Sequence, residues 1–345
     1  MEKGKTGIVG FDIGGAHLKV VRAEAGRVVA AHIFATPLWQ GLECLDAAIA
    51  EAEPLYRGAE RLAFTMTGEL VDIFSCREEG VAALIDRIER HFPDTEKLIY
   101  TVEAGLVGPN RARQMPDAVA SANWHATASL AARLKGEALF VDMGSTTTDI
   151  LALAGGSVRN RAATDAGRLS TSELVYTGFT RTLPFGVAST APVQGRLTPL
   201  MNEFFAAMGD VHRILGMLPD GIDQHVTADG KEKTMEASVA RLARMVGRDA
   251  AELTDAEWHT VAEWFSERQL RMVHDAAVLV ATGLAPDAPV IGAGIGRPQI
   301  ARLARRMERP YLDFATLFPV EEAARDEASA AAPATALALL AGMAG

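Results

Sequence analysis

Two short segments of the sequence combine aspartate and glycine in the same order. Residues 7–23 read GIVGFDIGGAHLKVVRA, and residues 138–153 read ALFVDMGSTTTDILAL. In each, an apolar run ends at an Asp, the chain bends at Gly, and a second apolar run follows. Glycine permits torsions and close approach that a side chain would block, so amide N–H groups there can face phosphate oxygens. The pair predicts a phosphate site built twice, which clamps one polyanionic ligand from two sides.

The first turn places a lysine shortly after its aspartate. Asp12 ends the incoming run, two glycines follow, and Lys19 comes seven residues after Asp12. Side chains alternate along a strand, so Lys19 points away from its apolar neighbours, and its ammonium can return to the pocket as a point charge. We predict Asp12 and Lys19 as catalytic residues, and Gly14 and Gly15 as phosphate-binding residues.

The second turn carries hydroxyl groups where the first has none. Four hydroxyl side chains follow Gly144, and the run closes with Asp149. Carboxylates do not attract phosphate, but they suit a hydrated Mg²⁺, which keeps its waters and takes few direct carboxylates. We therefore predict a Mg²⁺ held by Asp12 and Asp142. Asp142 and Asp149 join the predicted catalytic residues, and the phosphate-binding residues predicted here are Gly144, Ser145, Thr146 and Thr147.

A third glycine-rich segment lies late in the chain. Residues 288–307, APVIGAGIGRPQIARLARRM, predict a buried strand, a loop and an amphipathic helix. The loop glycines Gly292, Gly294 and Gly296 are candidates for holding adenosine, or they serve only as a strand-to-helix turn, because this motif alone does not establish a dinucleotide fold. ATP is therefore a second candidate ligand.

These three elements, in this order, resemble the superfamily of actin, sugar kinases and heat-shock chaperone ATPases. The run DMGSTTTDI at 142–150 is most similar to the hydantoinase and oxoprolinase branch. Further segments resemble bacterial proteins associated with tetrahydromethanopterin-linked one-carbon transfer. That family is similar in turn to the archaeal synthase that joins an aminomethylfuran diphosphate to a glutamylated tyramine during methanofuran biosynthesis. The segments are TMTGELVDIFSCREEGV (65–81), SANWHATASLAA (121–132), ELVYTGFTRTLP (173–184) and the stretch from DVHRILGMLP to TADGK (210–231).

One departure from the hydantoinase branch concerns the first turn. That branch typically continues this turn as GGTFTD, whereas residues 14–19 read GGAHLK, so that Lys19 replaces a closing acid. The change shifts the local charge toward anion binding, which suits a diphosphate. It also weakens a simple transfer of ATP-dependent ring-opening activity to this chain.

Composition indicates a soluble cytoplasmic enzyme. A chain of 345 residues with 49% hydrophobic and 23% charged residues can bury two substantial cores. The start, MEKGKTGIVG, lacks a signal-peptide layout, and no apolar run reaches the length of a membrane span. The formal net charge of −10 disfavours nucleic-acid binding. We expect small-molecule diphosphate and phenolic amine substrates, no membrane or nucleic-acid partner, and a homo-oligomer as an open alternative.

The alternation of strands and helices, with the resemblance, predicts a two-lobed α/β fold of ribonuclease-H-like lobes with a ligand cleft between them. We place the first lobe at 1–134 and the second at 135–345, with a mainly helical insertion at about 200–284. Strands are expected at 62–68 and 97–107, and helices at 78–92, 123–134 and 331–345.

Other polar residues are candidates for contacting substrate. Glu69 and Asp72 follow a predicted strand end, and Arg77 is either an anion contact or an exposed ion-pair partner. Arg181 suits a glutamyl carboxylate or a diphosphate through its paired N–H donors. The predicted substrate-binding residues are Glu69, Asp72, Arg77, Asn123, Thr177, Gly178 and Arg181.

Three functions remain open from the sequence. The resemblance implies a transferase in which a phenol oxygen displaces pyrophosphate from the furan carbon, stabilised by amides, Lys19 and Mg²⁺. A phenol with a pKa of about 10 needs a general base, for which we name Asp12 or Asp149. The alternatives are an ATP-dependent kinase or hydantoinase-like hydrolase, and an ATP-gated interaction protein.

Overall fold

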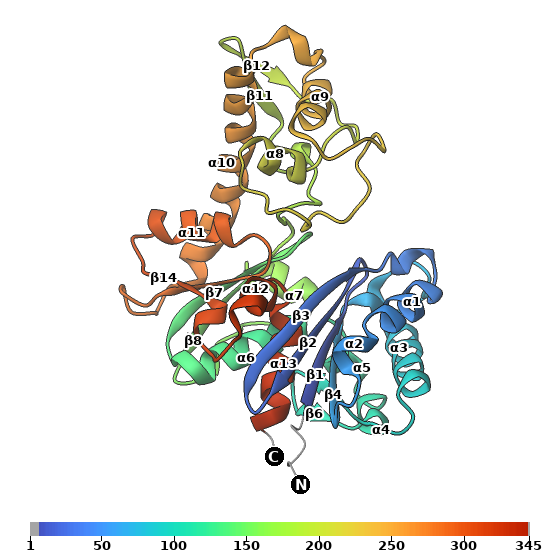
Figure 1. The fold of residues 1–345 in the computed structure, drawn as a ribbon. Coiled ribbons are helices and arrows are strands. Elements are labelled where there is room, and N and C mark those ends of the chain that lie inside the picture. The colour runs from blue at the N-terminus through green and yellow to red at the C-terminus, as the bar shows by residue number, and fades with distance from the viewer. Residues whose placement is uncertain (1–6, 344–345) are drawn as a thin grey trace. The chain divides into compact units, whose positions relative to one another are not determined.

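The computed structural model describes residues 7–343 (Figure 1). It contains two compact units. One comprises the chain up to Phe140, residues Ala152–Asp165 and the chain from Leu312 on; the other comprises Val141–Leu151 and Ala166–Tyr311. Our expectations about the first six residues and the last two of the terminal helix lie outside the described residues.

The first sheet has the strand order of a ribonuclease-H-like lobe. Its six strands lie in the order β3-β2-β1-β4-β5-β6. Strand β2 is antiparallel to its neighbours β1 and β3, and β4 is parallel to its neighbours β1 and β5. The strands are β1 (Gly7–Ile13), β2 (His17–Glu24), β3 (Arg27–Ala35), β4 (Arg61–Met66), β5 (Glu96–Thr101) and β6 (Gly105–Val107). The helices of this part of the chain are α1 (Glu43–Glu51), α2 (Glu53–Tyr56), α3 (Arg77–His91), α4 (Pro109–Ala112), α5 (Pro116–Val119) and α6 (Asn123–Lys135).

The second sheet repeats this order with later strands. Its path is β10-β8-β7-β13-β14, and β9 pairs with β8. The strands are β7 (Ala138–Met143), β8 (Thr148–Ala154), β9 (Ser157–Val158), β10 (Leu174–Val175), β13 (Val290–Ala293) and β14 (Tyr311–Asp313). Helix α7 (Asp165–Ser170) precedes β10, and α11 (Arg297–Arg306) follows β13. The prediction of an α/β fold with two ribonuclease-H-like sheets is confirmed.

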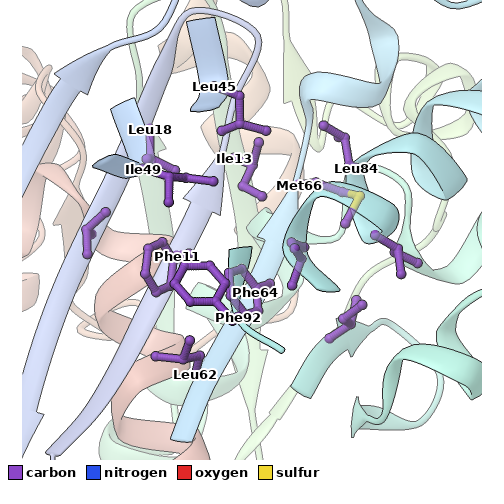
Figure 2. Packing of buried hydrophobic residues seen from close by; sticks show 14 of the residues in the cluster. Phe11, Ile13, Leu18, Leu45, Ile49, Leu62, Phe64, Met66, Leu84 and Phe92 are labelled. Carbon is purple, nitrogen blue, oxygen red and sulfur yellow. The ribbon is translucent and has the colours of Figure 1, made fainter. Parts of the chain in front are cut away.

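Aromatic packing fixes the end of β1, where the first turn begins. Phe11 of β1 and Phe64 of β4 are register partners on neighbouring parallel strands, and their rings stack with centroids 4.8 Å apart. Phe92 packs beside both rings, and Figure 2 shows the three aromatic side chains together among aliphatic neighbours. Buried aromatic pairs contribute stability beyond their area alone. This cluster therefore holds the strand that presents Asp12.

The terminal apolar helix packs on the first sheet, as its composition predicts. Helix α13 (Ala332–Met343) contacts β1, β2, β4 and α6, and in Figure 1 it is the red helix that lies along the blue strands. A Cβ placed on Gly10 would lie 2.0 Å from the carbonyl oxygen of Ala334, so only glycine permits this approach. Helix α12 (Arg325–Ala330) leads into it.

The second unit contains the predicted helical region. Its helices are α8 (Met208–Ile214), α9 (Met235–Met245) and the long α10 (Asp255–Val280), accompanied by the hairpin β11 (Thr190–Val193) and β12 (Arg196–Pro199) (Figure 1). Gly247 and Gly283 follow α9 and α10 with positive φ, as expected of helix stops. The domain boundaries themselves stay a prediction.

One predicted strand is wrong in its extent. We expected a single strand over 97–107, but the segment forms β5 and β6, which pair with each other as antiparallel strands. Gly105 takes a φ of 67°, and the Thr101 hydroxyl closes the turn by accepting from the Ala104 amide. The apolar residues on both sides of Glu103 suggested one strand, but the segment contains a tight reversal that glycine makes easy.

Candidate functional site

The first turn is a tight hairpin between β1 and β2. The Gly14 amide donates to the carbonyl of His17 at 2.9 Å, which closes the turn. Within residues 7–343, the amides of Gly15 and Ala16 at the tip donate no hydrogen bond. These two donors are therefore available to an acceptor, while the Gly14 amide serves the turn itself.

Asp12 and Lys19 form an ion pair beside this turn. They are register partners across the hairpin, and Lys19 Nζ lies 2.9 Å from Asp12 Oδ2. Asp12 is 2% exposed and Lys19 is 23% exposed. The other carboxylate oxygen, Oδ1, is buried and has no hydrogen-bond partner among the described residues. The pair thus presents a partly exposed cation and an oxygen with unused acceptor capacity.

The second turn reproduces this backbone. The Gly144 amide donates to the carbonyl of Thr147, again at 2.9 Å, and Asp142 again lies two residues before the glycine. In the described part of the chain, the amides of Ser145 and Thr146 donate no hydrogen bond. The sequence similarity of the two turns is therefore a similarity of geometry as well, with two unused amides at each tip.

The predicted segment around Gly178 packs on the second turn. The amide of Phe179 donates to the Gly144 carbonyl at 2.8 Å, and the amide of Arg181 donates to the Ser145 carbonyl at 2.9 Å. A Cβ on Gly178 would lie 2.4 Å from Ser145 backbone atoms, so the segment needs glycine there. The Arg181 guanidinium reaches the Thr146 hydroxyl at 3.4 Å. The structure thus brings Gly178 and Arg181 to the predicted phosphate-binding residues.

Thr177 has a structural partner in the same segment. Its carbonyl accepts from the Thr148 hydroxyl at 2.7 Å, and its own hydroxyl accepts from the Gln269 amide of α10 at 3.0 Å. The side chain is fully buried. These contacts anchor the segment behind the second turn, and they leave the substrate-binding role of Thr177 a prediction.

The late glycine loop also packs on the second turn. Gly294 has a φ of 80°, and a Cβ there would lie 2.3 Å from Asp142 Oδ1. A Cβ on Gly296 would meet the Met143 side chain at 2.3 Å, and one on Gly292 would meet the Tyr311 ring at 2.6 Å. Close packing therefore accounts for all three glycines. The loop's role in adenosine binding stays a prediction.

Asp149 has a buried partner that the sequence did not reveal. Its carboxylate pairs with Arg168 of α7, whose side chain is 2% exposed. Arg168 also donates to the Glu173 carbonyl at 3.3 Å. A proton placed on Asp149 would break this pair, so the contact favours a structural role over the general-base role that we predicted.

A second polar cluster lies beside the first turn, at the carboxyl end of β4. It contains Glu69, from the short helix η2 (Gly68–Leu70), together with Arg77, Ser121 and Asp165. The Ser121 hydroxyl lies 3.0 Å from Glu69 Oε1 and 3.3 Å from Asp165 Oδ2, and Arg77 donates to the same Asp165 oxygen at 2.7 Å. Burial raises the pKa of Glu69 to about 7, against the hydrogen bond from Ser121 and the charge of Arg77. Acids with shifted pKa values are common at functional sites, so this cluster is a candidate site.

Packing places this cluster next to the first turn. A Cβ on Gly68 would lie 3.2 Å from the Ile13 carbonyl oxygen, and a Cβ on Gly15 would meet the Val71 side chain at 2.9 Å. Ligands of α/β sheets bind at the carboxyl ends of parallel strands. The structure therefore brings Glu69 and Arg77 toward one edge with Asp12 and Lys19.

Two predicted residues take no part in these contacts. Asp72 is exposed on the loop after η2. Asn123 starts α6, and its side-chain oxygen accepts from the Trp124 amide at 2.8 Å, which is a local helix-start contact. Their substrate-binding roles stay predictions.

Sequence reasoning missed Ser121, Asp165, Arg168 and His225. Ser121 has a φ of 52°, a conformation uncommon for residues other than glycine. Burial and the nearby Arg181 charge lower the pKa of His225 to about 4, so this imidazole is neutral near the second turn. Ser121 lies in the segment 121–132 and His225 in the segment 210–231, and both segments resemble the family. This resemblance was the signal in the sequence that could have identified the two residues. Nothing local marked Asp165 or Arg168.

The comparisons with known proteins identify the family. The model of the hydantoinase/oxoprolinase family matches residues 61–310, which include the second turn and the late glycine loop. The chain belongs to this family. The first turn lies before the matched residues.

Two curated relatives carry the same descriptive name, (4-{4-[2-(gamma-L-glutamylamino)ethyl]phenoxymethyl}furan-2-yl)methanamine synthase. The chain is 29% identical to the protein of Methanocaldococcus jannaschii over 334 residues, which cover 96% of this chain and 97% of the relative. It is 30% identical to the protein of Methanococcus vannielii over 124 residues, which cover 36% of this chain and 55% of that relative.

A solved structure shows the same fold. It is the nucleotide-free acetone carboxylase from a study of ATP-dependent acetone carboxylation, with a TM-score of 0.55. The alignment covers 97% of this chain and 70% of that chain at 10% sequence identity. At this identity the likeness concerns the fold alone.

Proposed function

We propose that the chain is a biosynthetic transferase of methanofuran-type cofactor synthesis. It joins an aminomethylfuran diphosphate to a phenolic acceptor, such as tyramine, tyrosine or a glutamylated form, and releases pyrophosphate. Support comes from the similarity to the archaeal synthase along nearly the whole chain. The structural observation that carries the proposal is Lys19, a partly exposed cation beside a turn with two unused amides.

The reaction is a displacement at the furan-bearing carbon. The phenol oxygen forms a bond to that carbon, the carbon–oxygen bond to the diphosphate breaks, and its electron pair leaves with pyrophosphate. Negative charge develops on the leaving group, and the Lys19 ammonium and the amides of Gly15 and Ala16 would stabilise it. The amides of Ser145 and Thr146 and the exposed Arg181 guanidinium offer a second set of donors for phosphate or a carboxylate.

Each turn carries a carboxylate of the kind that suits a hydrated magnesium ion. Asp12 Oδ1 is a buried carboxylate oxygen without a partner in the described chain, and Asp142 is a second carboxylate in the equivalent position of its turn. Residues 7–343 contain no group of three or more His, Cys, Asp or Glu that could hold a metal. Mg²⁺ needs only one or two carboxylates beside water and substrate phosphates. When bound, it would neutralise charge on the leaving diphosphate.

The proposal includes a cytoplasmic location and charged small-molecule substrates. None of the helices within residues 7–343 has the length and apolar character that crossing a bilayer requires.

Calorimetric binding in the presence of Mg²⁺ is the first test. We expect pyrophosphate to bind wild-type protein with no gain from an adenosine group, and to bind Lys19→Ala about 10- to 100-fold more weakly, because one charge-assisted contact is lost. Lys135→Ala, on an exposed side chain at the end of α6, is the control and should bind as wild type. ATP or ADP binding much more tightly than pyrophosphate would instead favour the kinase or hydrolase alternative.

The reaction itself is tested by pyrophosphate release. Purified protein, Mg²⁺, furanmethanamine diphosphate and each phenolic acceptor should yield pyrophosphate and the ether product above an Asp142→Ala control. Thermal melting of each variant separates lost chemistry from lost folding. No release above that control with any of the acceptors would reject the proposed reaction.

A further inference from the structure

The cluster around Glu69 is built so that one hydroxyl lies between two carboxyl groups. Ser121 Oγ is within hydrogen-bond distance of both Glu69 Oε1 and Asp165 Oδ2. A hydroxyl has a single hydrogen to donate. If both carboxyl groups were ionised, Ser121 could satisfy only one of them, and the other contact would be unfavourable.

The surrounding charges decide which carboxyl takes a proton. Arg77, in the first turn of α3, donates to Asp165 at 2.7 Å, so Asp165 has a cationic partner. Glu69 is 1% exposed, and its second oxygen, Oε2, is buried with no hydrogen-bond partner in the described structure. Burial without a direct cationic partner favours the neutral form. A protonated Glu69 can donate to Ser121 while Ser121 donates to Asp165, and every close contact is then satisfied.

The backbone at Ser121 indicates that this arrangement is held at a cost. Ser121 has a φ of 52° and is 7% exposed, and the preceding Ala120 forms a bridge with Met66 at the end of β4. Unfavourable torsions of this kind persist where the surrounding structure enforces them, and they cluster at functional sites. The cluster also lies next to the turn that carries Lys19, as the packing of Gly68 and Gly15 shows.

We propose that Ser121 and Glu69 form the proton-accepting pair of the transfer reaction, in place of Asp12 or Asp149. This inference rests on the proposed function. The phenol proton passes to Ser121 Oγ as the Ser121 proton passes to Glu69 Oε1, and the phenol oxygen bonds to the furan-bearing carbon. The carbon–diphosphate bond breaks, and its electron pair leaves with pyrophosphate. Glu69 is the base, Ser121 the group that touches the acceptor, and Asp165 with Arg77 positions Ser121.

The relay explains how a buried acid can serve an entering substrate. Glu69 itself need not reach the acceptor, because the hydroxyl carries the proton between them. Once protonated, Glu69 donates back to Ser121, and Ser121 donates to Asp165, so the network stabilises the state that has accepted the proton. The pKa of about 7 also lies where general bases work well at neutral pH.

Two substitutions test the relay while preserving the fold. Ser121→Gly removes the hydroxyl but suits the positive φ, so the protein should remain folded. Glu69→Gln keeps the shape of a neutral carboxyl group. Each should lower kcat for pyrophosphate release about 100- to 10,000-fold, with pyrophosphate binding within about twofold of wild type. The exposed Glu103→Gln is the matched control and should keep full activity.

The pH profile is the readout that a merely structural role would not move. In wild type, kcat/KM should fall with a slope of one as the pH drops below about 7, because Glu69 must start unprotonated. Glu69→Gln should lack this acidic limb. If the kcat/KM profile of Glu69→Gln keeps the acidic limb, or if Ser121→Gly keeps full kcat, the relay is wrong. The proposed transferase function would be unaffected by either result. A wild-type protein that releases no pyrophosphate overturns the proposed function, and the relay with it.

Infrared spectroscopy detects the proton independently of turnover. Below pH 7, wild-type protein should show a carboxylic-acid C=O band that is absent in Glu69→Gln and present in Glu103→Gln. The band should titrate away as the pH rises past about 7. Spectra of wild type and Glu69→Gln that are identical in this region would contradict the inference.

Discussion

The two turns share one backbone but differ in the cation that accompanies each. In both turns, a glycine amide donates at 2.9 Å to the carbonyl oxygen of the residue three positions later. In both, an Asp lies two residues before that glycine. In the first, the cation is Lys19, which is 23% exposed. In the second, the cation paired with the closing Asp149 is Arg168, which is 2% exposed.

This difference separates a cation that can meet a ligand from one that supports the fold. Lys19 keeps part of its surface in solvent, and its ammonium has three donors, one of which goes to Asp12. Arg168 is enclosed and also bonds the Glu173 carbonyl. The first turn thus leaves its ion-paired cation partly in solvent, whereas the second turn encloses the cation that pairs with its closing aspartate.

The largest effect should come from removing the enclosed cation. Arg168→Met leaves Asp149 without its partner, and breaking a buried pair on one side costs about 3–5 kcal/mol. Lys19→Met should lower the free energy of unfolding by about 1.5–3 kcal/mol, since water can replace a partly exposed donor. Urea unfolding of both variants measures the difference. Equal losses would show that the two cations play the same structural part.

The groups beside the two turns should respond to pH in opposite directions, beginning with Glu69. Its pKa is raised to about 7 in the folded chain, mainly by burial, from an ordinary value of 4.5. The folded state therefore binds this proton more tightly, and the resulting stability is complete below pH 4.5 and lost as the pH rises through 7. At about 1.4 kcal/mol per pH unit, wild type should lose about 3 kcal/mol relative to Glu69→Gln between pH 4.5 and 8. Urea unfolding at several pH values measures this, and parallel curves for the two proteins would contradict it.

His212 supports the second turn and should show the reverse trend. Its Nδ1 donates to the Phe179 carbonyl at 2.7 Å, its ring stacks on Phe179, and the Phe179 amide bonds the Gly144 carbonyl. Burial lowers the pKa of His212 from 6.5 to about 4. Its stabilisation is thus complete above pH 6.5 and lost as the pH falls through 4. Relative to His212→Gln, wild type should lose about 3 kcal/mol between pH 7 and 4, measured by guanidinium unfolding. A constant difference between the two proteins would show that folding does not lower the pKa of His212.

Features that depend on neighbouring residues could be predicted from the sequence. Both hairpins, the strand and helix around Gly294, and the apolar α13 follow from runs in which every determining residue is close along the chain. The pairing of Asp12 with Lys19 is of this kind, because strand alternation and a short turn suffice to place it.

Contacts between distant residues could not be predicted in the same way. Glu69 meets Ser121 after 52 residues and Asp149 meets Arg168 after 19, across segments that carry no periodic signal for either contact. The sequence left the scaffold role of the late glycines as one of two alternatives, because the choice depends on how closely Gly294 approaches Asp142. A sequence pattern shows where the chain can turn, but only the structure shows which residues pack against the turn.

The smallest expected effect tests how closely the two turns correspond. A Cβ on Gly14 would lie 2.9 Å from the His17 carbonyl oxygen, whereas a Cβ on Gly144 would lie 3.7 Å from the Thr147 oxygen, an ordinary contact. Gly14→Ala should therefore lower the free energy of unfolding by about 1–2 kcal/mol through overpacking. Gly144→Ala should change it by less than about 0.5 kcal/mol, as expected where nothing is displaced. Thermal unfolding of the two variants at one pH measures both values, and a larger loss for Gly144→Ala would show that the second turn is the tighter one.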